Sequence, residues 1–333
     1  MARSLLALPA MTDTAKGRWR MGWIGWTVLS LVLLGALGFA AWRHAVRTNA
    51  VAVLDGADRL LSGGDGAIRL AASARYGADP AQKLEMFLPA GAQGPLPVLV
   101  FIHGGGWSSG DPHDYRFIAR TFCAQGYAVV LAGYRLYPAA RFPAMLEDGA
   151  AALRWVHDNA ANAGGDPSRL ALMGHSAGAY NAVMLTLDPQ WLRGVGLDPA
   201  MIGGTVSLAG PFDFLPFDTP STIHSFGAAA DPAATQPVNF ARADAPPLLL
   251  VTGDEDTRVK PRNSRRLARL LTEEGAPTAP VILEGVGHEG IIMMLARPFS
   301  RDTRLLDAVL PFLHRATAAR HAPASVAVQA PGA

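Results

Sequence analysis

Apolar and polar positions alternate along most of this chain in one repeating pattern. Eight short runs rich in valine, leucine and isoleucine are bounded by glycine, proline or polar residues: IRLAASARY, KLEMFLP, LPVLVFIH, YAVVLAGY, LALMGHS, GTVSLAG, PPLLLVTGD and PVILEGVGH. Runs of this length and composition predict β-strands. Because segments of helical length separate the later runs, the pattern predicts an α/β fold, a mostly parallel eight-stranded sheet with helices on both faces.

The longest apolar stretch lies outside this alternation, near the N-terminus. Residues 21–42, MGWIGWTVLSLVLLGALGFAAW, contain no charged residue and are apolar on all sides. This length suffices for a helix to cross the hydrocarbon core of a bilayer. We therefore predict one transmembrane helix. The alternatives are a signal sequence cleaved after GFA, just before Ala41, and a buried helix of a soluble domain.

The basic residues around this stretch predict its orientation. Arginine or lysine occupies four of the positions from 3 to 20, whereas Arg43 and Arg47 follow the stretch closely. By the positive-inside rule, residues 1–20 form a cytoplasmic N-terminal segment and the rest of the chain faces the periplasm or the exterior. Cleavage of the apolar stretch would instead give a secreted protein.

The remaining boundaries follow from composition. Residues 43–66 end in the turn-like SGGDG and predict a linker, whereas residues 67–315 hold all eight strand candidates. Residues 211–245 interrupt the alternation with prolines and phenylalanines. We interpret them as an insertion over the sheet edge, which either caps a pocket or packs its phenylalanines onto the core. Residues 316–333 have no apolar periodicity and predict a disordered tail.

Composition and charge narrow the range of functions. The chain has 333 residues, of which 50% are hydrophobic, enough to fill a sizeable core. A formal net charge of +2 argues against a nucleic-acid-binding surface. Cys123 is the single cysteine, so neither an intramolecular disulfide nor a cysteine-based metal cluster can form.

The stretch GHSAG contains the candidate nucleophile, Ser176. A serine in a G-x-S-x-G pattern sits on a sharp strand-to-helix turn, where Gly174 and Gly178 keep Cβ atoms out of the crowded backbone. The apolar run before Ser176 and the helical spacing of AGAYNAVMLTL after it match that context. Because a serine hydroxyl is too weakly acidic to ionise at neutral pH, Ser176 needs a base and a carboxylate that orients the base.

His288 is the candidate base, and three acidic residues compete to orient it. His288 lies in GVGHEG, just past the last strand candidate, where a loop at the carboxyl edge of the sheet can direct it toward Ser176. The acid is expected between serine and histidine in chain order and just after a strand. The stretch LLLVTGDEDTRV offers Asp254, Glu255 and Asp256, and their proximity in sequence does not choose among them.

The stretch FIHGGGW predicts a site for the negative charge that develops on a substrate carbonyl oxygen. Acyl transfer needs backbone N–H donors placed in advance at that oxygen. Glycines that follow a strand allow the backbone to approach the oxygen closely. We expect Gly105, Gly106 and Ala177 to donate, with His103 bracing the loop through a hydrogen bond. Gly104 and Trp107 complete the predicted loop.

From about Ile68 to His314, the chain resembles the α/β-hydrolase superfamily, and more narrowly the bacterial carboxylesterases related to hormone-sensitive lipase and to feruloyl or acetyl esterases. The resemblance rests on GHSAG, HGGGW, YRLYP at 134–138 and FPAMLEDGAAALRWV at 142–156. The family's acid commonly follows a G-x-x-D-x-x-V spacing, which Gly253, Asp256 and Val259 match, so the resemblance implies Asp256. The chain departs from the family at Ala139, where an acidic residue is frequent, and in lacking an N-terminal helical cap, which implies a more open site.

These features predict a serine hydrolase that cleaves a small-molecule carboxylic ester without a metal ion or cofactor. An arylformamidase or a peptidase would use the same fold and the same three residues. A ligand receptor on an inactive hydrolase scaffold is the alternative from a different class. The presence of Ser176, Asp256 and His288 argues against a receptor, because such a protein is expected to lose part of this set.

Overall fold

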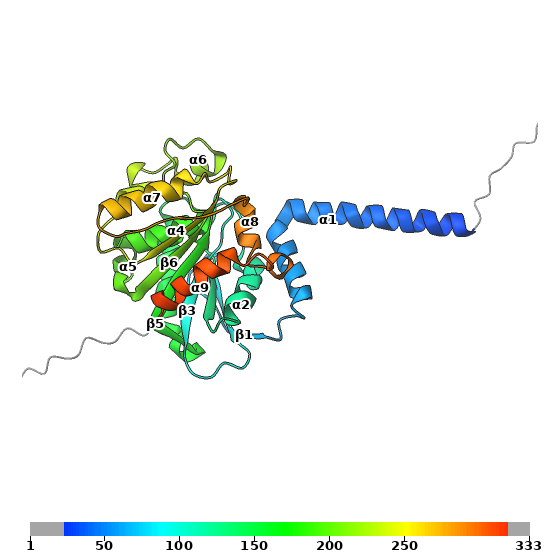
Figure 1. The fold of residues 1–333 in the computed structure, drawn as a ribbon, viewed down its shortest axis with the longest axis horizontal. Coiled ribbons are helices and arrows are strands. Elements are labelled where there is room, and N and C mark those ends of the chain that lie inside the picture. Colours follow the sequence, from blue (N-terminus) through cyan, green and yellow to red (C-terminus); the bar gives the residue numbers. More distant parts are fainter. Residues whose placement is uncertain (1–22, 319–333) are drawn as a thin grey trace, which may run out of the picture. The chain divides into compact units, whose positions relative to one another are not determined.

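Eight strands form one sheet in the order β1-β2-β4-β3-β5-β6-β7-β8 in the computed structural model, which describes residues 23–318 (Figure 1). β1 and β2 pair antiparallel, as do β2 and β4, and the other neighbours pair parallel. Each of the eight predicted runs overlaps one strand, so the predicted fold class is confirmed. The strands are β1 (Ile68–Arg75), β2 (Lys83–Pro89), β3 (Leu96–Ile102), β4 (Ala128–Ala132), β5 (Gly165–His175), β6 (Ile202–Leu208), β7 (Leu248–Gly253) and β8 (Val281–Leu283).

Helices cover both faces of the sheet because alternate residues of the central strands point to opposite sides. In β3, Leu99 and Phe101 join one buried cluster, whereas Val98 and Val100 join another. α2, α8 and α9 pack in the first cluster, and α3, α4 and α5 in the second. A third cluster holds α7 against α4 and β7. The helices are α2 (Arg116–Cys123), α3 (Ala144–Asn159), α4 (Ala177–Leu187), α5 (Gln190–Gly194), α6 (Pro220–Phe226), α7 (Arg262–Glu273), α8 (His288–Met293) and α9 (Arg304–Ala316).

Short 3-10 helices occupy several of the connections. They span Pro112–Tyr115, Ala161–Ala163, Pro199–Met201, Ala233–Thr235, Pro237–Phe240 and Arg297–Phe299. Two of them, together with α6, fall inside the predicted insertion. Of the insertion's phenylalanines, Phe212 and Phe226 are fully buried. These side chains therefore pack onto the core, the second of the two interpretations drawn from the sequence.

α1 (Trp23–Leu61) crosses the boundary between the two compact units of the chain, which lies between Ala50 and Val51. The backbone at Asn49 is not helical, so a kink precedes this boundary. Within α1, the stretch Trp26–Leu61 is long and apolar enough to cross a membrane, with a mean hydropathy of 1.5 and none of its apolar window buried. An N-terminal signal sequence would meet the same criteria. Residues 21 and 22 of the predicted span lie outside the described residues.

The predicted linker at 43–66 differs from the structure, in which residues 43–61 are helical except at Asn49. The physical reason lies in contacts distant in sequence: Val51 and Leu54 pack against the core cluster that contains α2. The predicted tail also begins too early, since Ala316 ends α9 and Thr317 is buried. The tail beyond residue 318 lies outside the described residues.

A buried arginine lies at the centre of an ion-pair cluster inside the second unit. Arg120 of α2 pairs with Asp58 at 2.5 Å, with Asp65 at 2.6 Å and with Asp55, and its side chain is 6% exposed. Asp58 also accepts a hydrogen bond from the backbone N–H of Arg297 at 2.6 Å. Residues 51–66 thus belong to the second compact unit. Arg120 lies more than fifty positions in sequence from each of the three aspartates with which it pairs.

This cluster predicts a large loss of stability when its central charge is removed. Arg120→Met leaves the buried Asp58 carboxylate without its partner, which costs about 3–5 kcal/mol, equivalent to a fall of roughly 10 °C in Tm for a domain of this size. Arg59→Ala is the matched control, because Arg59 pairs with Asp65 at 3.1 Å while 63% exposed. It should cost less than about 1 kcal/mol. Equal melting temperatures for the two variants would contradict this role of Arg120.

Candidate active site

The turn around Ser176 is strained and tightly packed. Ser176 is the single residue between β5 and α4, and its backbone has φ 54° and ψ −120°, a conformation that non-glycine residues rarely adopt. A Cβ atom on Gly174 would lie 2.2 Å from the carbonyl oxygen of Gly178, and one on Gly178 would lie 2.1 Å from that of Ile102. Both glycines of the motif are therefore required by the packing.

The structure brings Ser176, His288 and Asp256 into a hydrogen-bonded row. His288 Nε2 lies 2.8 Å from Ser176 Oγ, and His288 Nδ1 lies 2.7 Å from Asp256 Oδ2. The side chains of His288 and Asp256 are 4% and 0% exposed. A carboxylate oxygen accepts the proton of Nδ1, which leaves Nε2 free to accept the proton of the Ser176 hydroxyl.

The structure separates the three candidate acids by their contacts. The second carboxylate oxygen of Asp256, Oδ1, accepts the backbone N–H groups of Arg258 at 2.9 Å and Val259 at 2.7 Å. Those two bonds orient Oδ2 toward His288. Asp254 instead accepts the backbone N–H of Gly285 at 2.8 Å, and Glu255 is exposed at the surface. Asp256 is therefore the one of the three that contacts the histidine.

The glycine loop after β3 lies directly against the Ser176 turn. Gly105 and Gly106 have φ of 116° and 58°. A Cβ atom on Gly105 would lie 2.0 Å from the carbonyl oxygen of Ser109, so Gly105 is needed for the loop to fold. A Cβ atom on Gly104 would lie 3.3 Å from the Cβ of Ser176. Ala177 begins α4, where helix N–H groups lack intrahelical acceptors and are available to an anion.

Two predicted supporting residues brace this loop. Nδ1 of His103 lies 2.8 Å from the carbonyl oxygen of Gly104. Burial lowers the pKa of His103, so the ring stays neutral and Nδ1 can carry the donated proton. The indole N–H of Trp107 donates to the Asn181 side chain at 3.2 Å. The side chains of His103 and Trp107 are both buried, so their packing and hydrogen bonds restrict the motion of the loop.

Two nearby residues were not singled out from the sequence. Ser221 of α6 faces the glycine loop, since a Cβ atom on Gly106 would lie 3.3 Å from the Cβ of Ser221. His175 contacts the backbone of His288 at 3.1 Å. No local pattern marks Ser221, whereas His175 stands inside the GHSAG motif and could have been noticed there. Among residues 23–318, no group of three or more His, Cys, Asp or Glu could hold a metal ion.

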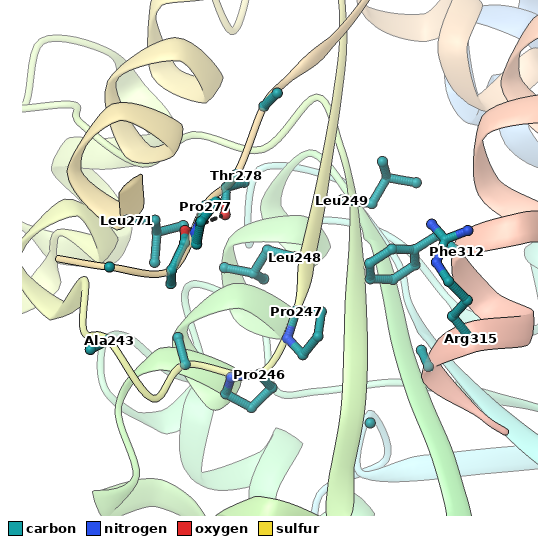
Figure 2. Close-up of a pocket in the computed structure, with 16 residues that line it drawn as sticks. Ala243, Pro246, Pro247, Leu248, Leu249, Leu271, Pro277, Thr278, Phe312 and Arg315 are labelled. Carbon is teal, nitrogen blue, oxygen red and sulfur yellow. Dashed lines mark hydrogen bonds between the residues drawn. The ribbon is translucent and has the colours of Figure 1, made fainter. Parts of the chain in front are cut away.

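A separate pocket of about 650 Å³ lies at the amino-terminal ends of the parallel strands, away from Ser176 (Figure 2). It is lined by Gly203 and Leu248, at the amino-terminal ends of β6 and β7. Ser176 follows the carboxyl end of β5, which runs parallel to β6. In parallel sheets the carboxyl edge is where ligands bind, so this pocket is not the candidate active site.

Comparisons with known proteins point to hydrolases. A family model described as BD-FAE matches residues 84–271, more than half of the chain. Carboxylesterase NlhH of Mycobacterium tuberculosis is 46% identical over 106 residues, covering 31% of this chain and 33% of that protein. Probable isoprenylcysteine alpha-carbonyl methylesterase ICMEL1 of Arabidopsis thaliana is 26% identical over 243 residues, covering 66% of this chain and 50% of that protein. The chain thus spans a third to a half of the length of these curated relatives.

Solved structures share the fold over a larger part of the chain. Esterase B from Lactobacillus rhamnosis superposes with a TM-score of 0.65 and 21% identity, covering 86% of this chain and 95% of that chain. A truncated carbohydrate esterase from gut microbiota gives a TM-score of 0.64 and 21% identity, covering 74% of this chain and 97% of that chain. At this level of identity the similarity concerns the fold.

Proposed function

The chain belongs to the BD-FAE family of the α/β-hydrolase superfamily, and from this premise we propose that it hydrolyses carboxylic esters through an acyl-enzyme on Ser176. The observation that carries the proposal is the row of contacts from Ser176 Oγ through His288 to Asp256, at 2.8 Å and 2.7 Å. A nucleophile, a base and an orienting carboxylate in this geometry are what acyl transfer by serine requires.

The proposed reaction has two half-reactions. His288 Nε2 takes the proton of the Ser176 hydroxyl as Oγ bonds to the substrate carbonyl carbon, and the N–H groups of Gly105, Gly106 and Ala177 stabilise the resulting oxyanion. The tetrahedral intermediate collapses to the acyl-enzyme, and His288 protonates the departing alcohol. Water then attacks the acyl carbon with His288 again as base, which releases the acid and restores the Ser176 hydroxyl.

Hydrolysis of p-nitrophenyl acetate by the purified full chain tests this proposal. Release of p-nitrophenol together with covalent labelling by a fluorophosphonate is the expected result. A protein that binds the ester without turnover and takes up no label would be a receptor on a hydrolase scaffold. A panel of aromatic esters, acetylated sugars, esters of graded acyl length, formylamides and peptides then identifies the leaving group that the site prefers.

The glycine loop gives a prediction that separates chemistry from stability. Gly106→Ala should lower kcat by about 10²–10³, the cost of one lost oxyanion donor. Gly94→Ala is the matched control, because Gly94 has a comparable φ of 76° and nothing within 4 Å of an added Cβ atom. Both variants carry the same kind of backbone strain, of about 1 kcal/mol, so only the first should affect catalysis.

The contact between Gly106 and α6 requires one further comparison. Because a Cβ atom on Gly106 would approach Ser221, the loss could come from a displaced α6 instead of a displaced donor. Adding Ser221→Gly to Gly106→Ala removes that contact. A double variant that stays impaired supports the loss of a donor, whereas recovery of wild-type kcat would contradict it.

We also propose that residues 21–42 remain as a membrane anchor and that the hydrolase lies outside the cytoplasm. The exposed apolar helix and the basic residues before it support this topology. Cell fractionation followed by protease treatment of spheroplasts is the measurement, and a full-length membrane-bound protein digested from outside is expected. A soluble protein trimmed near Ala41 would show a cleaved signal, and a membrane-bound protein protected until lysis would show the reverse orientation.

A further inference from the structure

His175 lies between the segment that carries His288 and the glycine loop that begins at Gly104. It is the last residue of β5 and precedes Ser176, and its side chain is buried. Its Nε2 atom is 3.1 Å from the backbone carbonyl oxygen of His288, and the two imidazole rings are 5.0 Å apart. On its other side, a Cβ atom on Gly104 would lie 3.2 Å from His175 Nδ1. One ring thus touches both the segment that carries the base and the glycine loop.

The partner of His175 determines which nitrogen carries the proton. A carbonyl oxygen only accepts hydrogen bonds, so Nε2 of His175 must be the protonated nitrogen and donates to His288. The titratable or charged groups that act on the ring are His288, Asp256 and Arg258. Burial, followed by the charge of His288, lowers the pKa of His175 to about 3. The ring therefore remains a neutral donor at the pH at which a serine hydrolase works.

The chain before His288 needs such a contact because its backbone has little stiffness of its own. Gly285 and Gly287 flank Val286 directly before α8, and Gly285 has φ 70°. The Asp254 side chain accepts a hydrogen bond from the N–H of Gly285 at 2.8 Å, and the N–H of Glu255 donates to the carbonyl oxygen of Val286 at 3.2 Å. These two bonds tie the loop to the end of β7. The bond from His175 differs in that it connects His288 itself to β5, the strand that ends directly before Ser176.

We propose that His175 is a positioning residue whose Nε2–H holds the His288 backbone at the distance that lets the imidazole reach Ser176. The proposal rests on the function proposed above. Residues 175 and 288 are separated by 113 positions in sequence, and Ser176 lies at the start of α4 whereas His288 begins α8. The bond from His175 therefore links the strand that precedes the nucleophile directly to the backbone of the base.

His175→Phe tests the link because phenylalanine keeps a ring of similar size and removes the donor. We expect kcat to fall by about 10²-fold, the effect of misplacing a reacting group by about 1 Å, with KM nearly unchanged. The rate of fluorophosphonate labelling of Ser176 should fall in parallel. His175→Gln, which retains an N–H donor, should recover part of both rates, and a purely structural role would show no such recovery.

Thr186→Val is the control for stability. Thr186 lies near the end of α4, where its buried hydroxyl bonds to Thr205 at 2.7 Å, so this variant loses a buried hydrogen bond away from the site. It should lower Tm and leave kcat and the labelling rate unchanged. Assays are run well below the Tm of every variant, so that each kinetic value refers to folded protein.

The outcomes separate this proposal from the proposed function. If His175→Phe turned over substrate and took up label at wild-type rates, the positioning role would be overturned while the hydrolase assignment stood. If wild-type protein neither turned over esters nor took up label, the proposed function would fail first. Nitrogen NMR of the imidazoles adds a readout independent of activity: His175 should stay in the neutral Nε2–H form from about pH 5 to about pH 9, and protonation within that range would overturn the proposal.

Discussion

Ser176→Ala should lower kcat for ester hydrolysis by several orders of magnitude, on the order of 10⁴–10⁶. The Oγ atom of Ser176 is the one that forms the acyl bond in the proposed mechanism, and His288 has no other hydroxyl at hydrogen-bond distance on Nε2 among the described residues. Fluorophosphonate labelling should disappear with the activity. The measurement is kcat with p-nitrophenyl acetate, together with mass spectrometry of the labelled protein.

Ser207→Ala provides the matched control for this variant. Ser207 lies on β6 beside Gly174 of the nucleophile motif, and its buried Oγ has no hydrogen-bond partner among the described residues. Removing that hydroxyl should leave both activity and labelling unchanged. If Ser176→Ala kept wild-type turnover, or if the label appeared on another residue, the assignment of the nucleophile would be wrong.

Asp256→Asn should lower kcat by about 10⁴. The asparagine side-chain oxygen would keep the two backbone bonds from Arg258 and Val259, which turns the amide N–H₂ toward His288 Nδ1. Nδ1 must then become an acceptor, so the ring proton moves to Nε2, where it blocks acceptance of the Ser176 proton. The fold should be retained, and kcat measured at saturating substrate reports the loss.

Asp254→Asn separates this effect from a general change of charge in the same loop. Asp254 accepts one hydrogen bond from Gly285 through Oδ1, and an asparagine oxygen can accept the same bond. Activity should therefore stay near the wild-type value. A large loss in Asp254→Asn together with a small loss in Asp256→Asn would reverse the assignment of the acid.

Local sequence was sufficient for the strands and for the turn that carries Ser176. A strand buried on both faces, such as β4 or β6, reads as a short continuous apolar run, and each of the eight predicted runs overlaps a strand. Gly174 and Gly178 likewise mark a turn, because a Cβ atom at either position would meet a backbone oxygen. These features depend on residues close in sequence, which is why a reading of the chain could find them.

The geometry of the site depended on contacts that no local pattern records. The spacing around Asp256 matched a family pattern, but only the fold aims Asp256 at His288 and Asp254 at Gly285. Residues 51–61, predicted as part of a linker, form a helix whose Asp58 pairs with Arg120, 62 positions away in sequence. The bond between His175 and His288 spans 113 positions. The spacing of apolar residues and the steric need for glycine act over a few neighbouring residues, so both can be recognised in the sequence. A buried charge or hydrogen-bond donor, in contrast, meets its partner only when the whole chain has packed.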